Sequence, residues 1–360
     1  MSALPLPKQG ILDIKPYIGG EGRVEGVEHL VRLASNENAL GCSPKAREAY
    51  LKCANEIFRY PDGSAAELRG ALGKSYDMDP ARIICGSGSE ELISLLVRAY
   101  AGAGDEVLFS QYGFLMYPIC TKAVGATPVT APEIDFRTDV DALLKAVTPK
   151  TKMLLLANPN NPTGSYIGRD ELKHLCENLP PHIMLLLDSA YAEFVQEKDY
   201  SDGRDMVDAY PNVVMLRTFS KIYGLAALRL GWGYCSPDVA GVVNRVRGAF
   251  NVGAPAQAAG VAALGDADFL KRTLEMTNTG RRYLTENITG LGYRVLPSVA
   301  NFLLVEFGPK AEQIRNALKD KGIFIRQMGA YNLPQHLRIT VGTADDNERL
   351  IRQLKLAADK

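Results

Sequence analysis

Residues 217–231, Arg-Thr-Phe-Ser-Lys-Ile-Tyr-Gly-Leu-Ala-Ala-Leu-Arg-Leu-Gly, bring an amine, two hydroxyls and a guanidinium into one short stretch. Lys221 follows the hydroxyls of Thr218 and Ser220, and Arg229 lies eight residues further along. Hydroxyls and a guanidinium can hold a phosphate while the neighbouring amine bonds a carbonyl carbon as a Schiff base. The combination is typical of a site for a phosphorylated aldehyde cofactor. A surface loop with a solvated lysine would contain the same residue types.

A glycine-rich turn forms a second candidate site. Residues 86–90, Gly-Ser-Gly-Ser-Glu, follow a short apolar strand predicted at 83–85 and precede a helix predicted at 90–101. Glycines let the backbone curl round an anion, and a helix N-terminus supplies free N–H groups. A plain helix cap would use the same residues, so the turn alone does not establish an anion site.

Two polar segments follow apolar runs further along the chain. Residues 158–164, Asn-Pro-Asn-Asn-Pro-Thr-Gly, come after the run 151–157, and their prolines and glycine direct the Asn161 amide outward as a donor. Asp188 ends the apolar run 183–187. A carboxylate at the end of a buried strand is costly unless it meets a cation, such as a protonated pyridine nitrogen. A helix N-cap is the alternative reading of Asp188.

The pattern of apolar residues predicts a doubly wound α/β structure followed by an α+β region. Continuous apolar runs at 151–157 and 182–187 indicate strands buried on both faces of a parallel sheet, and ligands bind at the carboxyl ends of such strands. We also expect strands at 83–85, 107–110, 213–217 and 231–235, and helices at 44–58, 65–76 and 90–101. The α+β region is expected to hold helices at 255–264, 268–289, 311–321 and from 347, with strands at 300–306, 323–327 and 336–342.

These elements divide the chain into three parts. Residues 1–35 form an N-terminal arm that is neither helix nor strand, residues 36–245 a large domain, and residues 246–360 a smaller domain. A chain of 360 residues is long enough for two domains, and its 46% hydrophobic and 23% charged residues are ordinary for a globular enzyme.

Charge and cysteine usage limit the possible partners. The 41 basic and 41 acidic residues cancel, so no overall field favours nucleic acid or an anionic membrane. Six scattered cysteines and four histidines form no metal-ligand spacing and no disulfide framework. With no signal-peptide pattern at the N-terminus and no apolar run long enough to cross a bilayer, we expect a cytoplasmic protein that binds small molecules.

In this order along the chain, the motifs resemble the fold-type-I aminotransferases that use pyridoxal 5′-phosphate (PLP). The resemblance rests on residues 86–90, residues 158–164, Asp188 with Tyr191, and Ser220-Lys221 with Arg229, and it covers most of the chain. It implies a large domain with a mostly parallel seven-stranded sheet between layers of helices, a smaller α+β domain, and PLP as the cofactor.

The resemblance also implies roles for individual residues. Lys221 would bond the cofactor aldehyde and shuttle a proton, Asp188 would pair with the pyridine nitrogen, and Tyr191 would hydrogen-bond the ring hydroxyl together with Asn161. Tyr60 would reach the cofactor phosphate of a neighbouring subunit in a homodimer with shared active sites. The remaining phosphate ligands would be Gly88, Ser89, Glu90, Thr218, Ser220 and Arg229.

Two aromatic residues compete to stack on the pyridine ring. The family pattern has an aromatic, two residues, then Tyr, and ends eight residues later at Gly. Phe114, Tyr117 and Gly125 match this spacing, which favours Phe114 over Tyr112. Either ring could instead fill the core.

A finer resemblance is to the histidinol-phosphate aminotransferases. Its marks are Lys-Pro-Tyr at 15–17, Leu-Ala-Ser-Asn-Glu-Asn at 33–38, Arg-Tyr-Pro-Asp-Gly at 59–63, Ala-Asn-Phe at 300–302, and the pair Arg326 and Arg338. It implies transfer of the amino group of L-histidinol phosphate to 2-oxoglutarate, giving imidazole-acetol phosphate and L-glutamate in histidine biosynthesis. The substrate would meet Tyr17, Asn36, Asn161, Arg326 and Arg338.

The chain departs from the subfamily pattern at two places, and other functions stay open. Ala227 stands where a glycine is usual, and Ala39-Leu40 follow Asn38 where a proline is usual. An aromatic amino acid aminotransferase or a dual-specificity enzyme would use the same residues, because a carboxylate also suits Arg338. A PLP decarboxylase of a phosphorylated amino acid has a similar layout. A non-catalytic sensor domain is disfavoured because no basic helix-turn-helix segment precedes the arm.

Overall fold

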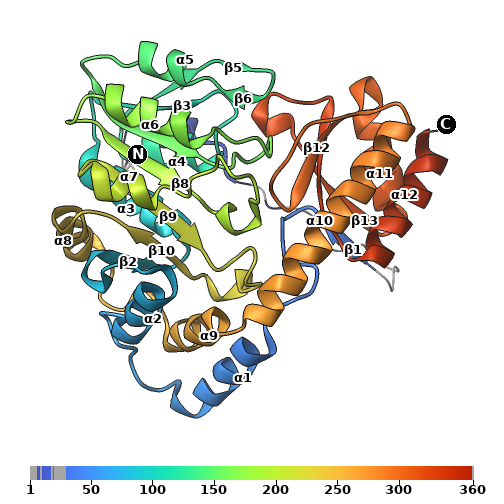
Figure 1. The fold of residues 1–360 in the computed structure, drawn as a ribbon. Helices are drawn as coiled ribbons and strands as arrows, with labels where there is room; N and C mark the ends of the chain where they lie inside the picture. The colour runs from blue at the N-terminus through green and yellow to red at the C-terminus, as the bar shows by residue number, and fades with distance from the viewer. Residues whose placement is uncertain (1–5, 9, 18, 20–29, 359–360) are drawn as a thin grey trace, which may run out of the picture.

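The computed structural model describes residues 6–8, 10–17, 19 and 30–358, which form two main β-sheets with their helices. In Figure 1 the larger sheet lies on the left, and the smaller sheet lies on the right beside the C-terminus. The long helix α10 (Ala267–Gly290) extends from the larger half into the smaller half.

The larger sheet has seven strands in the order β2-β10-β9-β8-β7-β3-β4. All neighbouring strands are parallel except β10, which runs antiparallel to both β2 and β9. This confirms the predicted mostly parallel seven-stranded sheet. Its strands are β2 (Ile83–Gly86), β3 (Glu106–Ser110), β4 (Thr127–Ala131), β7 (Thr151–Ala157), β8 (Met184–Asp188), β9 (Val213–Thr218) and β10 (Gly231–Tyr234).

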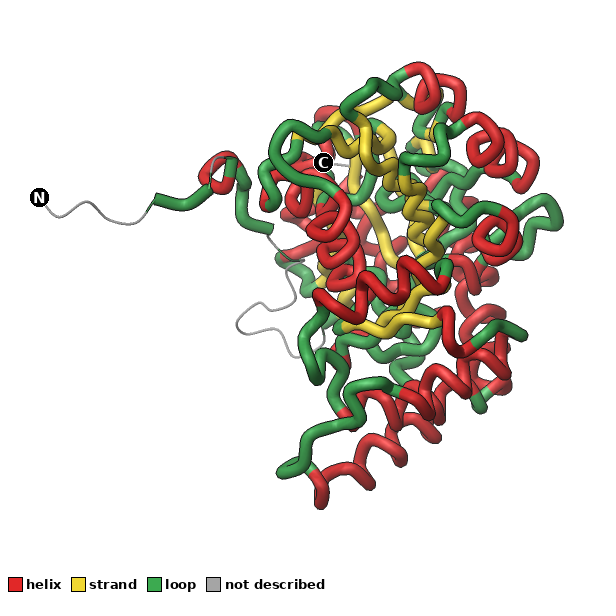
Figure 2. Tube along the Cα trace, turned by 90° about the vertical axis from the view of Figure 1, so that its left-hand side faces the viewer, coloured by secondary structure: helices red, strands yellow, loops and turns green. Residues whose placement is uncertain are grey.

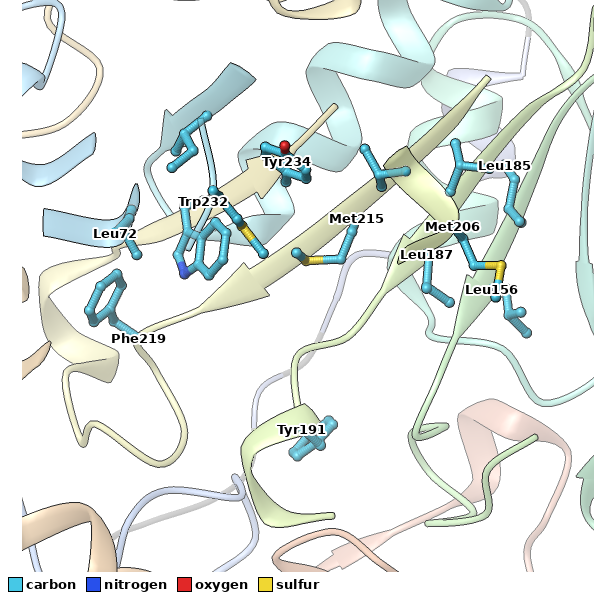
Figure 3. Packing of buried hydrophobic residues seen from close by; sticks show 14 of the residues in the cluster. Leu72, Leu156, Leu185, Leu187, Tyr191, Met206, Met215, Phe219, Trp232 and Tyr234 are labelled. Atoms are coloured by element: carbon cyan, nitrogen blue, oxygen red, sulfur yellow. The ribbon is translucent and has the colours of Figure 1, made fainter. Parts of the chain in front are cut away.

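The central strands are apolar throughout because both faces of the sheet are covered. Alternate residues of β8 enter different core clusters: Leu185 and Leu187 pack on one face, and Leu186 packs on the other. Side chains from β7 and β9 join Leu185 and Leu187 in the first cluster, as Figure 3 shows for Leu156 and Met215. A strand with a period of two buries every residue only between two covering layers.

Within the described part of the chain, helices α1 to α9 accompany the larger sheet. The predicted helix at 44–58 is shorter than expected and ends in a separate 3-10 turn, η2 (Cys53–Glu56), and α4 to α8 were not predicted. The helices are α1 (Pro44–Lys52), α2 (Ala66–Tyr76), α3 (Ser89–Tyr100), α4 (Met116–Ala123), α5 (Val140–Lys145), α6 (Arg169–Asn178), α7 (Arg204–Ala209), α8 (Pro237–Val246) and α9 (Ala254–Leu264).

The smaller sheet has five strands in the order β1-β13-β14-β12-β11. Helices α10, α11 (Ala311–Lys319) and α12 (Ala344–Ala358) accompany it, and side chains from the sheet and these helices form its core. The strands are β1 (Val31–Leu33), β11 (Arg294–Val295), β12 (Phe302–Glu306), β13 (Ile323–Gln327) and β14 (His336–Thr340). A separate two-stranded ribbon joins β5 (Glu133–Ile134) and β6 (Arg137–Thr138).

The expectation that residues 1–35 contain neither helix nor strand is wrong in two places. Val31–Leu33 forms β1, which pairs in parallel with β13, and Ile11–Asp13 forms a 3-10 turn. A three-residue strand has too short a pattern to detect, and its partner lies almost the whole chain away, with Val31 opposite Ile323. The first described residues of the arm project from the body of the molecule (Figure 2).

The division of the chain at residues 35 and 245 stays a prediction. Strand β1 pairs in the smaller sheet, although it precedes the large domain in sequence. Helix α9 packs against α1 and α2, which accompany the larger sheet. Among the described helices, none combines the length and apolar character needed to span a bilayer.

We expect Leu185→Ala to lower the free energy of unfolding by about 2–5 kcal/mol, because Leu185 is fully buried on a covered face of the sheet. Urea denaturation of the cofactor-free protein measures this. The control Leu356→Ala, at a side chain that is 58% exposed, should change stability by less than about 0.5 kcal/mol. Equal losses in the two variants would contradict the assigned core.

Candidate active site

A pocket of about 390 Å³ lies at the carboxyl ends of the parallel strands of the larger sheet and is closed on one side by the smaller sheet. Strands β7, β8 and β9 end at this pocket with Ala157, Asp188 and Thr218. Fourteen of the predicted site residues line it: Tyr17, Asn36, Ser89, Glu90, Phe114, Asn161, Asp188, Tyr191, Thr218, Ser220, Lys221, Arg229, Arg326 and Arg338.

Asp188 is a buried carboxylate with an unfilled acceptor position. It is 6% exposed, and its Oδ2 accepts a hydrogen bond from the Tyr117 hydroxyl at 3.2 Å. Its Oδ1 is buried and accepts no hydrogen bond from any residue that the structure describes. Burial raises the pKa of Asp188 to about 6, although the Tyr117 hydroxyl, the Ala190 N–H and the Lys221 ammonium act in the opposite direction. A cationic N–H donor in the pocket would fill the vacant acceptor and offset the cost of burying the charge.

Lys221 lies in the turn that follows β9 and lines the same pocket as Asp188. Its Nζ donates to the Ser35 carbonyl oxygen at 3.3 Å and lies 5.6 Å from the centroid of the Tyr191 ring. The Tyr191 hydroxyl accepts a hydrogen bond from the Asn36 side-chain amide at 3.0 Å. Residues from the N-terminal segment thus position both the amine and the phenol.

The turn at residues 86–90 and the turn after β9 form a cradle for an anion. Gly88 has a φ of 84°, and a side-chain carbon there would lie 2.5 Å from Nη2 of Arg229. The Arg229 Nη1 also donates to Oγ of Ser220 at 3.4 Å. Helix α3 begins at Ser89 beside this guanidinium, so its free N–H groups and dipole add to the positive potential. A phosphate fits this set of donors.

Arg326 and Arg338 enter the pocket from the smaller sheet. They are directly opposed across the antiparallel pair β13–β14, which places both side chains on one face of the sheet. Arg338 is 7% exposed, and its Nη2 donates to the Ala34 carbonyl oxygen at 3.0 Å while its Nη1 donates to the Asn161 side-chain oxygen. The Arg326 guanidinium lies 5.7 Å from the centroid of the Tyr17 ring.

Burial lowers the pKa of Arg338, and the charge of Arg326 acts in the same direction. The buried Nε of Arg338 has no hydrogen-bond partner among the described residues. Two guanidinium groups that face one pocket repel each other until an anion lies between them. The arrangement therefore suits a doubly charged anionic group.

The two aromatic candidates for the stacking position lie in different surroundings, and the choice between them stays a prediction. Phe114 lines the pocket and meets Tyr117 edge-on, with ring centroids 5.9 Å apart. Tyr112 is absent from the lining and stacks instead on Phe136 at 5.4 Å. The position of Phe114 agrees with the choice made from the motif spacing.

Two predicted site residues lie outside the pocket lining. Gly88 contributes through its contact with Arg229 in the anion cradle. Tyr60 is 83% exposed and stacks on Phe250, with ring centroids 4.6 Å apart. Tyr60 therefore does not contribute to the pocket of its own chain.

Sequence reasoning missed two tyrosines at the site. Tyr117, whose hydroxyl holds Asp188, lies one helical turn after Phe114, so its place in the same motif was an available signal. Tyr331 lines the pocket beside Arg338, and burial raises its pKa. It belongs to the 3-10 turn η7 (Gly329–Tyr331), where no sequence pattern marks it.

An amine, a buried carboxylate and an anion cradle meet in one pocket at the end of a mostly parallel sheet. This arrangement is typical of an enzyme that uses a phosphorylated aldehyde cofactor. The chain belongs to the aminotransferase class I and II family, whose model matches residues 28–354. Among its relatives, the histidinol-phosphate aminotransferase of Paramagnetospirillum magneticum is 52% identical over 355 residues, covering 98% of each chain. That of Rhodospirillum centenum is 53% identical over 349 residues, covering 96% of each chain.

A solved structure carries the same likeness. The histidinol-phosphate aminotransferase of Sinorhizobium meliloti in complex with pyridoxal 5′-phosphate superimposes with a TM-score of 0.91 at 30% identity, covering 99% of both chains. These matches confirm the predicted family, the fold-type-I architecture and PLP as the cofactor.

We expect the pKa of Asp188 to appear in the stability of the cofactor-free protein. Because burial raises this pKa to about 6, the folded state holds a proton that the unfolded state loses near its ordinary value of 3.8. Relative to Asp188→Asn, the wild type should therefore lose stability as the pH rises from about 4 through about 6, by on the order of 1–3 kcal/mol. Urea denaturation of both proteins across this range measures the difference.

A difference in the free energy of unfolding between the two proteins that does not change with pH would contradict the assigned burial.

With PLP bound, Asp188→Asn should also lower kcat, because the variant has no charge to pair with the pyridine nitrogen. This loss of kcat should be far larger than the loss expected if Asp188 served only as a helix cap.

Proposed function

We propose that this chain transfers the amino group of L-histidinol phosphate to 2-oxoglutarate, giving imidazole-acetol phosphate and L-glutamate in histidine biosynthesis. The observation that carries the proposal is the opposed pair Arg326 and Arg338, which presents two cations to the pocket that holds Lys221 and Asp188. Relatives about half identical over nearly the full length are histidinol-phosphate aminotransferases, which supports it.

The pocket residues fit PLP in three respects. The vacant Oδ1 of Asp188 suits a protonated pyridine nitrogen, the cradle around Gly88 and Arg229 suits a phosphate, and Phe114 offers a ring face. When bound, PLP supplies an aldehyde that condenses with amines and a ring that accepts electron density. In this proposal Ser89, Glu90, Thr218 and Ser220 complete the phosphate site, and Asn161 and Tyr191 hydrogen-bond the ring hydroxyl.

Lys221 carries the proton transfer in this proposal. Once its own proton is lost, the Nζ of Lys221 would take a proton from the substrate carbon that bears the amino group and return it to the atom on the far side of the amino nitrogen. The Ser35 carbonyl and the Tyr191 ring hold Nζ near this position. Asp188 stays charged opposite the pyridine nitrogen, which favours loss of that proton.

Arg326, Arg338 and Tyr17 bind the anionic end of each substrate. The phosphate of histidinol phosphate and the carboxylates of 2-oxoglutarate must alternate in one pocket, and paired guanidinium groups can hold either by charge-assisted hydrogen bonds. When cofactor and substrate bind, Asn161 exchanges its hydrogen bond with Arg338 for contacts with both of them. Asn36, which lines the same pocket, also contacts the substrate. An aromatic amino acid could use Arg338 alone, so a dual specificity is the competing form of the proposal.

We further propose that the protein forms a homodimer in which Tyr60 completes the partner's site. We also propose that it is located in the cytoplasm. Tyr60 adjoins exposed apolar side chains: Ile57 is 76% exposed and Phe58 71%, and the stacked Phe250 is 47% exposed. Such a patch is typical of a surface covered by another protein. The six cysteines are unpaired, which fits a reducing compartment.

We expect Arg326→Gln to lower kcat/KM for histidinol phosphate by about 10- to 100-fold, the equivalent of roughly 1.5–3 kcal/mol for a lost charged hydrogen bond. For phenylalanine, which carries no phosphate, the loss should be smaller. Coupled assays of 2-oxoglutarate consumption with each donor measure this, with the exposed Arg352→Gln as the matched control. Equal losses with both donors, or a wild type that prefers phenylalanine, would refute the substrate proposal.

Mixed subunits test the shared site. Tyr60→Ala and Lys221→Ala proteins should each be nearly inactive, but dissociation and re-association of a mixture should restore activity. Half of randomly formed dimers are hybrids with one intact site of two, so about a quarter of wild-type activity is expected. No recovery in a mixture in which co-purification of differently tagged subunits shows hybrids would sink the shared site.

A further inference from the structure

A second cleft adjoins the active-site pocket at its substrate end. It has a volume of about 490 Å³, within the range of small-molecule sites, and Tyr17, Leu115 and Arg326 line both cavities. The N-terminal arm, α4, α11 and β13 form its walls. No residue of the PLP site proposed above lies in this second cleft.

The charged residues that the structure describes in this cleft are almost all basic. Among the described residues that line it, one is acidic, Asp13, and five are basic: Lys15, Lys122, Arg315, Lys319 and Arg326. The whole chain has equal numbers of basic and acidic residues, so this excess is local. The cations come from four separate segments of the chain, and they are therefore brought together by the fold rather than by one basic stretch.

The remaining lining is largely apolar, with Ile14, Ile119 and Phe324 among its residues. Cations above an apolar floor act across a medium of low dielectric, which strengthens and focuses their field along the cleft. At physiological ionic strength the field of such a group reaches about 8 Å, enough to link neighbouring cations into one potential. This positive potential attracts an anion along the cleft as far as Arg326, which lines both cavities.

We propose that this cleft, the basic vestibule, is the entrance through which substrates that carry a dianionic phosphate or two carboxylates reach the active site. The phosphate of an incoming substrate is first held by the vestibule cations and then passes to Arg326 and Tyr17 as the amine end enters the pocket. The inference rests on the proposed function, in which both the donor and 2-oxoglutarate carry two negative charges. The volume of the vestibule admits one small molecule and not a polymer or a membrane surface.

The test is a double variant, Lys122→Gln with Arg315→Gln, which removes two vestibule charges without touching the active-site pocket. Stopped-flow mixing of the holoenzyme with histidinol phosphate gives the second-order rate constant from the change in cofactor absorbance. At low ionic strength we expect this constant to fall by about tenfold, the lower end of electrostatic steering. Near 1 M salt, where the Debye length is about 3 Å, the difference from wild type should vanish.

The matched control is Lys173→Gln with Lys271→Gln, which removes the same charge from side chains 58% and 75% exposed on α6 and α10. It should behave as wild type at both salt concentrations. Equal rate constants for the vestibule variant and the control at low salt would overturn the proposal. So would a loss in the vestibule variant that persists in high salt, because that loss would come from altered structure.

The reaction of the aminated holoenzyme with 2-oxoglutarate separates this inference from the donor assignment. If the wild type fails to use histidinol phosphate, the proposed function fails, but the vestibule variant should still react slowly with 2-oxoglutarate at low salt. If the wild type uses both substrates and the variant matches it with both, the vestibule fails alone.

Discussion

The cost of burying the Asp188 carboxylate is the constraint on which the rest of the site depends. The carboxylate ends the apolar strand β8, and β7 and β9 run beside it with their own ends at the same pocket. The Tyr117 hydroxyl donates a hydrogen bond to one of its oxygens, and the other oxygen has no hydrogen-bond partner among the described residues. A buried charge that is half satisfied is stable only with a cation beside it, and the protonated ring of PLP is a group of that kind.

The second constraint is the repulsion between Arg326 and Arg338. The register of β13 and β14 places the two side chains opposite each other, on one face of the smaller sheet, and both line the pocket. Contacts with the backbone of Ala34 and with Asn161 hold Arg338 in place. The N-terminal segment therefore belongs to the site twice, because Ser35 also binds the amine of Lys221. In the proposed function, one pocket thus contains a cofactor end made by the larger sheet and an anion end made by the smaller one.

Much of this arrangement could be predicted from the sequence because the chemistry stands at the ends of strongly apolar strands. The apolar runs before Asn158 and after residue 182 are typical of strands in a sheet that is covered on both faces. Parallel strands bring their carboxyl ends to one edge of the sheet. Strand β1 escaped prediction because its pairing with β13 is a long-range event with only three residues of local pattern. Tyr331 escaped for the same reason, since only the fold brings η7 to the pocket.

The choice of Phe114 over Tyr112 rests on motif spacing and stays a prediction, and the different surroundings of the two rings are visible only in three dimensions. Tyr112 packs on Phe136 away from the pocket, whereas Phe114 lies against Tyr117 and so against the support of Asp188. Helix α4, which contains Tyr117, holds a proline at 118, within its first turn, and is short, so its sequence does not show a clear helical period.

The central claim is that Lys221 performs the proton transfer while the other residues hold the cofactor. It is tested most directly by measuring PLP binding and amino transfer together in Lys221→Ala. We predict that this variant binds PLP in equilibrium dialysis, through Asp188, Arg229 and the turn at residues 86–90, yet forms no glutamate from histidinol phosphate and 2-oxoglutarate. Glutamate formation at a rate near that of the wild type, with PLP bound, would contradict the account.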